Sequence, residues 1–141
     1  MLSLLDICNI VNQMKKTSVE PIAMFFTIEM LRILEKLQKS NIIHGDIKPD
    51  NFLVTRQPDF RTDAQTSSDM FKNVTATMEM IDFGVSIDMS LFHKGQKFNH
   101  KFDKIDNRCP EMLEDRLWTY EVSIIFVTMH TPASFLGVVK K

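Results

Sequence analysis

The chain has 141 residues, 44% of them hydrophobic, which is the size and apolar content of one globular domain rather than of a disordered tail. Its 17 Lys and Arg residues are balanced by 18 Asp and Glu residues, so no net positive charge is available to hold a nucleic-acid backbone. No apolar stretch reaches the roughly 18 residues of a membrane span, and no signal-peptide pattern opens the chain. We therefore expect a soluble, intracellular protein without direct nucleic-acid or membrane binding.

Cysteine and glycine are too sparse for several kinds of site. Cys8 and Cys109 are the only cysteines, and they form neither a disulfide framework nor a CxxC zinc motif, so both are predicted to be free thiols. The four glycines fit neither a G-x-G-x-x-G nor a G-x-x-x-x-G-K loop. If a nucleotide binds, we expect its phosphate-covering loop to lie outside this chain.

Two helices are predicted at the start of the chain. Apolar residues recur at three- and four-residue steps from Leu2 to Met14, which predicts a short amphipathic helix closed by Lys15 and Lys16. A helix-start signal follows at residues 17–21, and an apolar stripe then continues to about Ser40. This second segment is the clearest helix in the sequence.

Short strands are predicted on either side of a polar loop. The apolar residues 42–43 precede the polar segment 44–51, and a strand at residues 52–54 follows it. Residues 55–77 are rich in Thr, Ser, Asp, Gln and Lys, which is typical of a polar surface insertion. A further short strand at residues 78–81 completes an antiparallel ribbon that we expect to pack on the helices.

Two polar motifs carry the chemistry. Residues 44–51 read HGDIKPDN, and residues 82–84 read DFG. Phosphoryl transfer to a hydroxyl needs a carboxylate at the attacking oxygen, a cation at the transferring phosphate and oxygen ligands for magnesium. Asp46 and Lys48 supply the first two groups, and Asn51 and Asp82 supply the third.

Each of these residues has a predicted role. Asp46 positions the acceptor hydroxyl and takes its proton, and Lys48 alternates to the same side of the loop and neutralises charge on the γ-phosphate. Asn51 and Asp82 offer the hard oxygen donors that Mg²⁺ requires, and Gly84 lets the chain turn sharply after the metal-binding carboxylate. His44 is predicted to be structural, bracing the loop, rather than a base.

These motifs resemble the eukaryotic protein kinase superfamily, whose catalytic loop is H-x-D-x-K-x-x-N and whose metal loop is D-F-G. Within it, residues 42–52 and 81–92, together with Lys94-Gly95, resemble the Bub family of mitotic spindle-checkpoint serine/threonine kinases. The glycine before the catalytic aspartate and the SIDM-x-LF sequence after D-F-G are the features that resemble this family.

The resemblance implies an α+β, protein kinase-like fold. The chain is then a partial kinase domain at residues 1–122, a mainly helical C-lobe with short strand pairs around the catalytic and D-F-G loops, with the polar insertion at residues 55–77. Residues 123–141 are expected to be a divergent or truncated tail. Ser123 stands where the family pattern has a buried aspartate, and no N-terminal lobe is expected in this chain.

The resemblance also implies function. It implies that Asp46 and Lys48 are catalytic. It also implies that ATP is bound by Lys48, Asn51 and Asp82, and that Mg²⁺ is bound by Asn51 and Asp82. It implies protein substrates, with histone tails and checkpoint proteins among them, kinetochore partners, and a location in the nucleus at the kinetochore, otherwise in the cytoplasm. Because Gly45 replaces the basic residue that clasps a phosphorylated loop in many kinases, control by loop phosphorylation is less expected.

Three alternatives stay open from the sequence. Without an N-terminal lobe, we expect the chain to be inactive on its own and only marginally stable. The family also includes degenerate kinases, so the chain could be a non-catalytic checkpoint scaffold. Small-molecule phosphotransferases of the aminoglycoside or choline kinase type share the His-Gly-Asp sequence with an asparagine five residues after the aspartate, although Lys48, the intact D-F-G and the sequence Cys109-Pro110-Glu111 argue against that class.

Overall fold

The computed structural model describes residues 1–13, 20–55, 78–102 and 108–123. The predicted polar insertion at 55–77 and the predicted tail at 123–141 therefore lie outside the described residues, apart from Thr55 and Ser123. The predicted division of the chain into these parts stays a prediction.

Helix α1, Leu4–Gln13, begins later than the apolar repeat predicted, because Ser3 caps it. The Ser3 N–H donates to Asp6 Oδ2 at 2.9 Å, and the Asp6 N–H donates to Ser3 Oγ at 3.1 Å. This reciprocal pair is a capping box, which satisfies N–H groups that the first turn leaves free. Leu2 and Ser3 form the short strand β1 instead of a helical turn.

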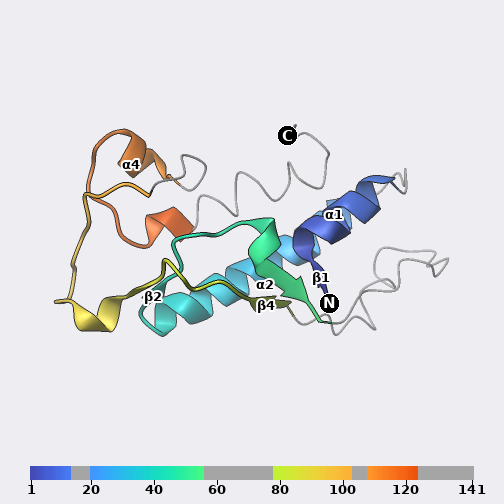
Figure 1. The fold of residues 1–141 in the computed structure, drawn as a ribbon, viewed down its shortest axis with the longest axis horizontal. Coiled ribbons are helices and arrows are strands. Elements are labelled where there is room, and N and C mark those ends of the chain that lie inside the picture. The colour runs from blue at the N-terminus through green and yellow to red at the C-terminus, as the bar shows by residue number, and fades with distance from the viewer. Residues whose placement is uncertain (14–19, 56–77, 103–107, 124–141) are drawn as a thin grey trace.

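The long helix α2, Glu20–Lys39, confirms the strongest prediction from the sequence. It runs through the centre of the molecule, with α1 near one end and α4, Pro110–Leu113, near the other (Figure 1). It ends where Asn41 adopts a left-handed φ of 60°, a conformation that Asn tolerates better than most residues.

The strands form two small antiparallel sheets. Strand β3, Phe52–Val54, pairs with β1 on one side and with β4, Met78–Met80, on the other, which confirms the predicted ribbon. Strand β2, Ile42–Ile43, pairs with β5, Ile87–Asp88, with Ile43 opposite Ile87. Strand β5 was not predicted, because a two-residue strand is too short to show alternation.

Two short 3₁₀ helices lie beside the strands. One, Pro49–Asn51, leads directly into β3, and the other, Met89–Leu91, follows β5. Asp88 caps the second by accepting a hydrogen bond from the Ser90 N–H at 2.9 Å. The first of these helices contains Asn51, one of the predicted site residues.

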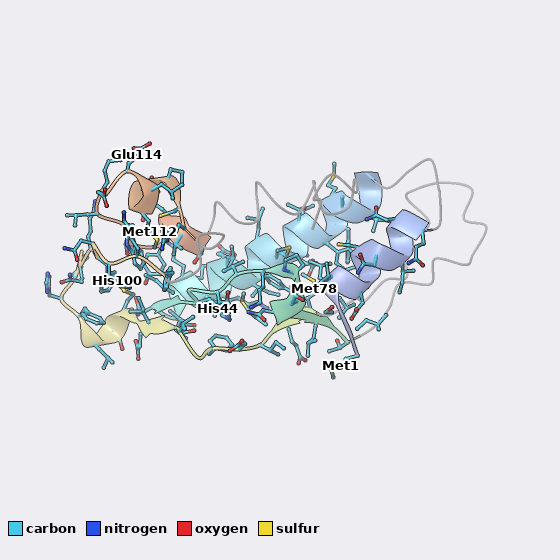
Figure 2. All side chains as sticks on the ribbon, turned by 45° about the horizontal axis from the view of Figure 1, so that its top comes forward. Met1, His44, Met78, His100, Met112 and Glu114 are labelled. Carbon is cyan, nitrogen blue, oxygen red and sulfur yellow. The ribbon has the colours of Figure 1, made fainter. Side chains whose placement is uncertain are left out.

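The core divides into two hydrophobic clusters. One joins α1, α2 and the three-stranded sheet, and its fully buried members include Leu4, Phe26, Met30 and Phe52. The other surrounds Trp118 and includes Ile43, Cys109, Met112 and Val122. In Figure 2, His44 lies between Met78 of the first cluster and Met112 of the second. The loop that carries the candidate catalytic residues is therefore anchored between two packed regions.

Both cysteines are free, as predicted, and the structure shows that both are buried. Burial raises the pKa of the Cys8 thiol to about 12, so this side chain acts as a small apolar group of the core. Among the described residues, none of the helices combines the length and the hydropathy needed to cross a membrane.

We predict that Phe26→Ala lowers the free energy of unfolding by about 3–5 kcal/mol, because it leaves a cavity under α2. Met24 lies on the exposed side of the same helix, so Met24→Ala serves as the matched control and should change stability by less than about 0.5 kcal/mol. Urea unfolding followed by circular dichroism measures both. Equal losses in the two variants would contradict the assignment of the core.

Candidate active site

The loop between β2 and β3 brings three of the four predicted site residues into direct contact. Lys48 Nζ lies 2.6 Å from Asp46 Oδ2. Asn51 Nδ2 donates to the Asp46 carbonyl at 2.8 Å and to Asp46 Oδ2 at 3.2 Å. The Asp46 carboxylate is thus held by a cation and an amide in a buried loop, as a positioned catalytic base requires.

Lys48 lies in a negative environment. Its hydrogen bond to Asp46 raises the pKa of Lys48, and the charges of Asp46, Asp50 and Asp82 raise this pKa further. The lysine therefore stays protonated. Its side chain is partly exposed, so a cation is available to an anionic group that enters from solvent.

The buried ring of His44 joins the catalytic loop to the D-F-G segment. The Asp46 N–H donates to His44 Nδ1 at 3.3 Å, so the proton is on Nε2, which donates to the Ile81 carbonyl at 3.0 Å. The ring also packs edge-on against Phe83, with the ring centroids 4.8 Å apart. His44 braces the loop through both nitrogens, and neither is left to act as a base.

Asp82 follows immediately after this link. The Ile81 N–H donates to the Asn51 carbonyl at 3.0 Å, so Asp82 begins beside the asparagine that is predicted to share a metal with it. Asp82 itself has a left-handed φ of 63°, which is uncommon for a residue with a side chain. Gly84 lies in the turn closed by the bond from the Ser86 N–H to the Phe83 carbonyl, but the left-handed residue is Asp82 and not the glycine.

The chemistry of Asn51 and Asp82 fits a hard divalent cation. The Asn51 amide nitrogen is committed to Asp46, and no described residue donates a hydrogen bond to its Oδ1. Asp82 presents an exposed carboxylate. These two oxygen ligands match the preference of Mg²⁺, which usually takes only one or two protein groups and completes its shell with phosphate and water. No group of three or more His, Cys, Asp or Glu residues suited to a metal occurs in the described part of the chain.

Residue 45 has to be a glycine, because the chain that follows D-F-G passes very close to its backbone. Its φ of +82° favours glycine, and a Cβ there would lie 2.7 Å from the Val85 carbonyl oxygen and 3.1 Å from the Phe102 ring. The Ser86 hydroxyl donates to the His44 carbonyl at 3.0 Å beside it. Sequence reasoning identified Gly45 only as a missing basic residue, and it did not identify Phe102, because nothing in the sequence marks which aromatic ring reaches the loop.

Glu111 has an unusual environment for an acidic residue. Its Oε2 is the buried side-chain oxygen that finds no hydrogen-bond partner among the described residues. Its other oxygen, Oε1, lies 3.9 Å from Arg116 Nη2, beyond hydrogen-bond distance. A buried carboxylate oxygen without a donor is costly.

Comparisons with known proteins give the same family as the motifs. The chain is 36% identical over 118 residues to the mitotic checkpoint serine/threonine-protein kinase BUB1 of Mus musculus, covering 81% of this chain and 10% of that protein. It is 40% identical over 102 residues to the corresponding bub-1 protein of Caenorhabditis elegans, covering 71% of this chain and 10% of that protein. A crystal structure of the BubR1 kinase domain matches with a TM-score of 0.74 and 32% identity, covering 96% of this chain and 37% of that chain.

This chain belongs to the Bub family. The fold prediction is thereby confirmed, since the match to a Bub-family kinase domain extends over nearly the whole chain. The chain spans about a tenth of the length of the curated mouse relative that it matches. No family model matches the chain.

We predict that the free energy of unfolding falls as the pH drops below 6.5 through the protonation of His44. Burial lowers the pKa of His44 from 6.5, so the unfolded chain binds this proton at a higher pH than the folded chain does. The contribution of neutral His44 to the free energy of unfolding is complete above pH 6.5. It is lost as the pH falls below that value, by up to about 1.4 kcal/mol per pH unit. His44→Gln, which keeps an N–H donor, should flatten this slope in urea titrations, whereas exposed His93→Gln should not. An unchanged slope in His44→Gln would show that the imidazole does not titrate in this way.

We also predict that alanine is tolerated much less well at Gly45 than at Gly95. Both glycines have left-handed φ angles, but a Cβ added at Gly95 would meet no atom within 4 Å. Gly95→Ala should therefore cost only the backbone strain, about 1–2 kcal/mol. Gly45→Ala should cost about 1–3 kcal/mol more, because it overpacks the loop against Val85 and Phe102. If Gly45→Ala and Gly95→Ala lost similar amounts of stability in urea unfolding, the close approach of Val85 and Phe102 to Gly45 would be contradicted.

Proposed function

We propose that this chain carries the phosphoryl-transfer residues of a spindle-checkpoint protein serine/threonine kinase, which moves the γ-phosphate of ATP onto protein hydroxyls. The observation that carries the proposal is the contact of Asp46 with both Lys48 and Asn51, beside the segment that leads to Asp82. The relatives are named as serine/threonine-protein kinases of the mitotic or spindle assembly checkpoint, which supports the same reaction class.

The residues would divide the work as follows. Asp46 accepts a hydrogen bond from the acceptor hydroxyl and takes its proton late in the transfer, when the transition state is already loose. The positive charge of Lys48 stabilises the phosphate oxygens that carry negative charge in the transition state. Asn51 and Asp82 would hold Mg²⁺, and Mg²⁺-ATP, when bound, supplies the phosphoryl group and neutralises its charge. His44 keeps the two loops in register, so catalysis rests on positioning.

The partners and location follow from the family and are part of the proposal. Checkpoint kinases act on proteins, so we infer a protein substrate, histones and checkpoint proteins being the first to test, and assembly with kinetochore proteins in the nucleus. The balanced charge of the chain supports a protein rather than a nucleic-acid partner.

A chimera provides the experiment. Residues 1–123 replace the matching segment of the mouse BUB1 kinase domain, and the product is incubated with Mg²⁺, radiolabelled ATP and histone. We predict transfer to serine or threonine, and a loss of about 10²–10⁴-fold in Asp46→Asn. Asp50→Asn removes an exposed neighbouring carboxylate that acts on Lys48 only through its charge, so it should leave the rate close to that of the chimera.

The other outcomes separate the alternatives. A folded chimera that binds no nucleotide would support a non-catalytic scaffold. Phosphorylation of choline or an aminoglycoside, but not of protein, would support a small-molecule phosphotransferase. The 141-residue chain, tested in parallel, should transfer no phosphate, because it contains no glycine-rich phosphate loop. Transfer by this chain above its Asp46→Asn variant would overturn that expectation.

A further inference from the structure

The aromatic residues after D-F-G make an unexpected contact with the catalytic loop. Two atoms of the Phe102 ring lie 3.1 and 3.2 Å from the point where a Cβ on residue 45 would stand, and the Val85 carbonyl oxygen lies 2.7 Å from the same point. In many kinases the residue at this position is an arginine that holds a phosphorylated loop, as the family resemblance implies. Here a ring from the same stretch of chain occupies the space beside the loop.

Phe102 is itself held in place from several directions. Its ring centroid lies 5.3 Å from that of Trp118 and 5.7 Å from that of His100. Arg108 Nε donates to the Phe102 carbonyl at 2.9 Å, and Trp118 Nε1 donates to the His100 carbonyl at 2.8 Å. Because Trp118 is fully buried, the Phe102 ring packs on a residue of the core.

We propose that Phe102 is a positioning residue of the catalytic loop, and that its ring replaces a phosphate–arginine contact as the support of that loop. The Phe102 ring packs against Gly45. The N–H of the next residue, Asp46, donates the hydrogen bond to His44 Nδ1. Loss of the ring would free the backbone at Gly45 and loosen that bond. The proposal rests on the proposed function in one respect, because the supported loop carries Asp46, the candidate base. It requires no phosphorylation of the chain.

Hydrogen exchange on the full 141-residue chain tests this. We expect amides 44–48 to exchange about tenfold faster in Phe102→Ala, and by a smaller factor in Phe102→Leu, while α2 stays protected. The matched control is Phe92→Ala, because Phe92 packs on Phe98, with the centroids 5.4 Å apart, in the same aromatic group but is not among the atoms nearest to Gly45. This control and treatment of the wild-type chain with a protein phosphatase should both leave amides 44–48 unchanged.

Either of two results would overturn the proposal. The first is that amides 44–48 of Phe102→Ala exchange as slowly as in the wild-type chain while α2 stays protected. The second is that amides 44–48 of the wild-type chain exchange faster after phosphatase treatment. If Phe102→Ala does not fold, Phe102→Leu decides by the same criterion. In the chimera, Phe102→Leu should lower kcat with little change in the KM for ATP. If the chimera transfers no phosphate but the exchange pattern holds, the proposed function fails and the positioning role stands.

Discussion

The imidazole of His44 joins the two segments of chain that form the candidate active site. One ring nitrogen accepts the Asp46 N–H, and the other donates to the carbonyl that directly precedes Asp82. A buried neutral ring satisfies both polar groups without placing a charge in the packed interior. The two loops therefore keep a fixed register, although a long stretch of sequence separates them. In the function that we propose, this register lets the side-chain oxygens of Asn51 and Asp82 bind one cation.

A second constraint acts from the outer side of the same loop. The Val85 carbonyl and the Phe102 ring approach Gly45 so closely that a side chain is excluded, and Ser86 adds a hydrogen bond to the loop. The glycine that distinguishes this family from most kinases is thus explained by sterics as well as by the loss of a positive charge. The pairing of β2 with β5 brings the two segments to this distance.

The sequence predicted the parts of the fold that repeat and the site residues that stand in a motif. Helix α2 and the β3–β4 ribbon were predictable from apolar periodicity. The roles of Asp46, Lys48, Asn51 and Asp82, inferred from their order and chemical types, stay predictions. Strands β1 and β5 were not, because two residues carry no periodicity. The left-handed φ of Asp82 and the role of Phe102 arise from tertiary contacts that no local pattern encodes.

The convergence of Asn51 and Asp82 on one cation is tested most directly by placing Mn²⁺ and ADP on the full chain and mapping paramagnetic broadening by NMR. The account predicts that the Asn51 side-chain amide and the backbone amides of residues 81–84 broaden first and together, and that Asp82→Asn abolishes the effect. Broadening of only one of these two segments, or of neither at saturating Mn²⁺-ADP, would contradict it.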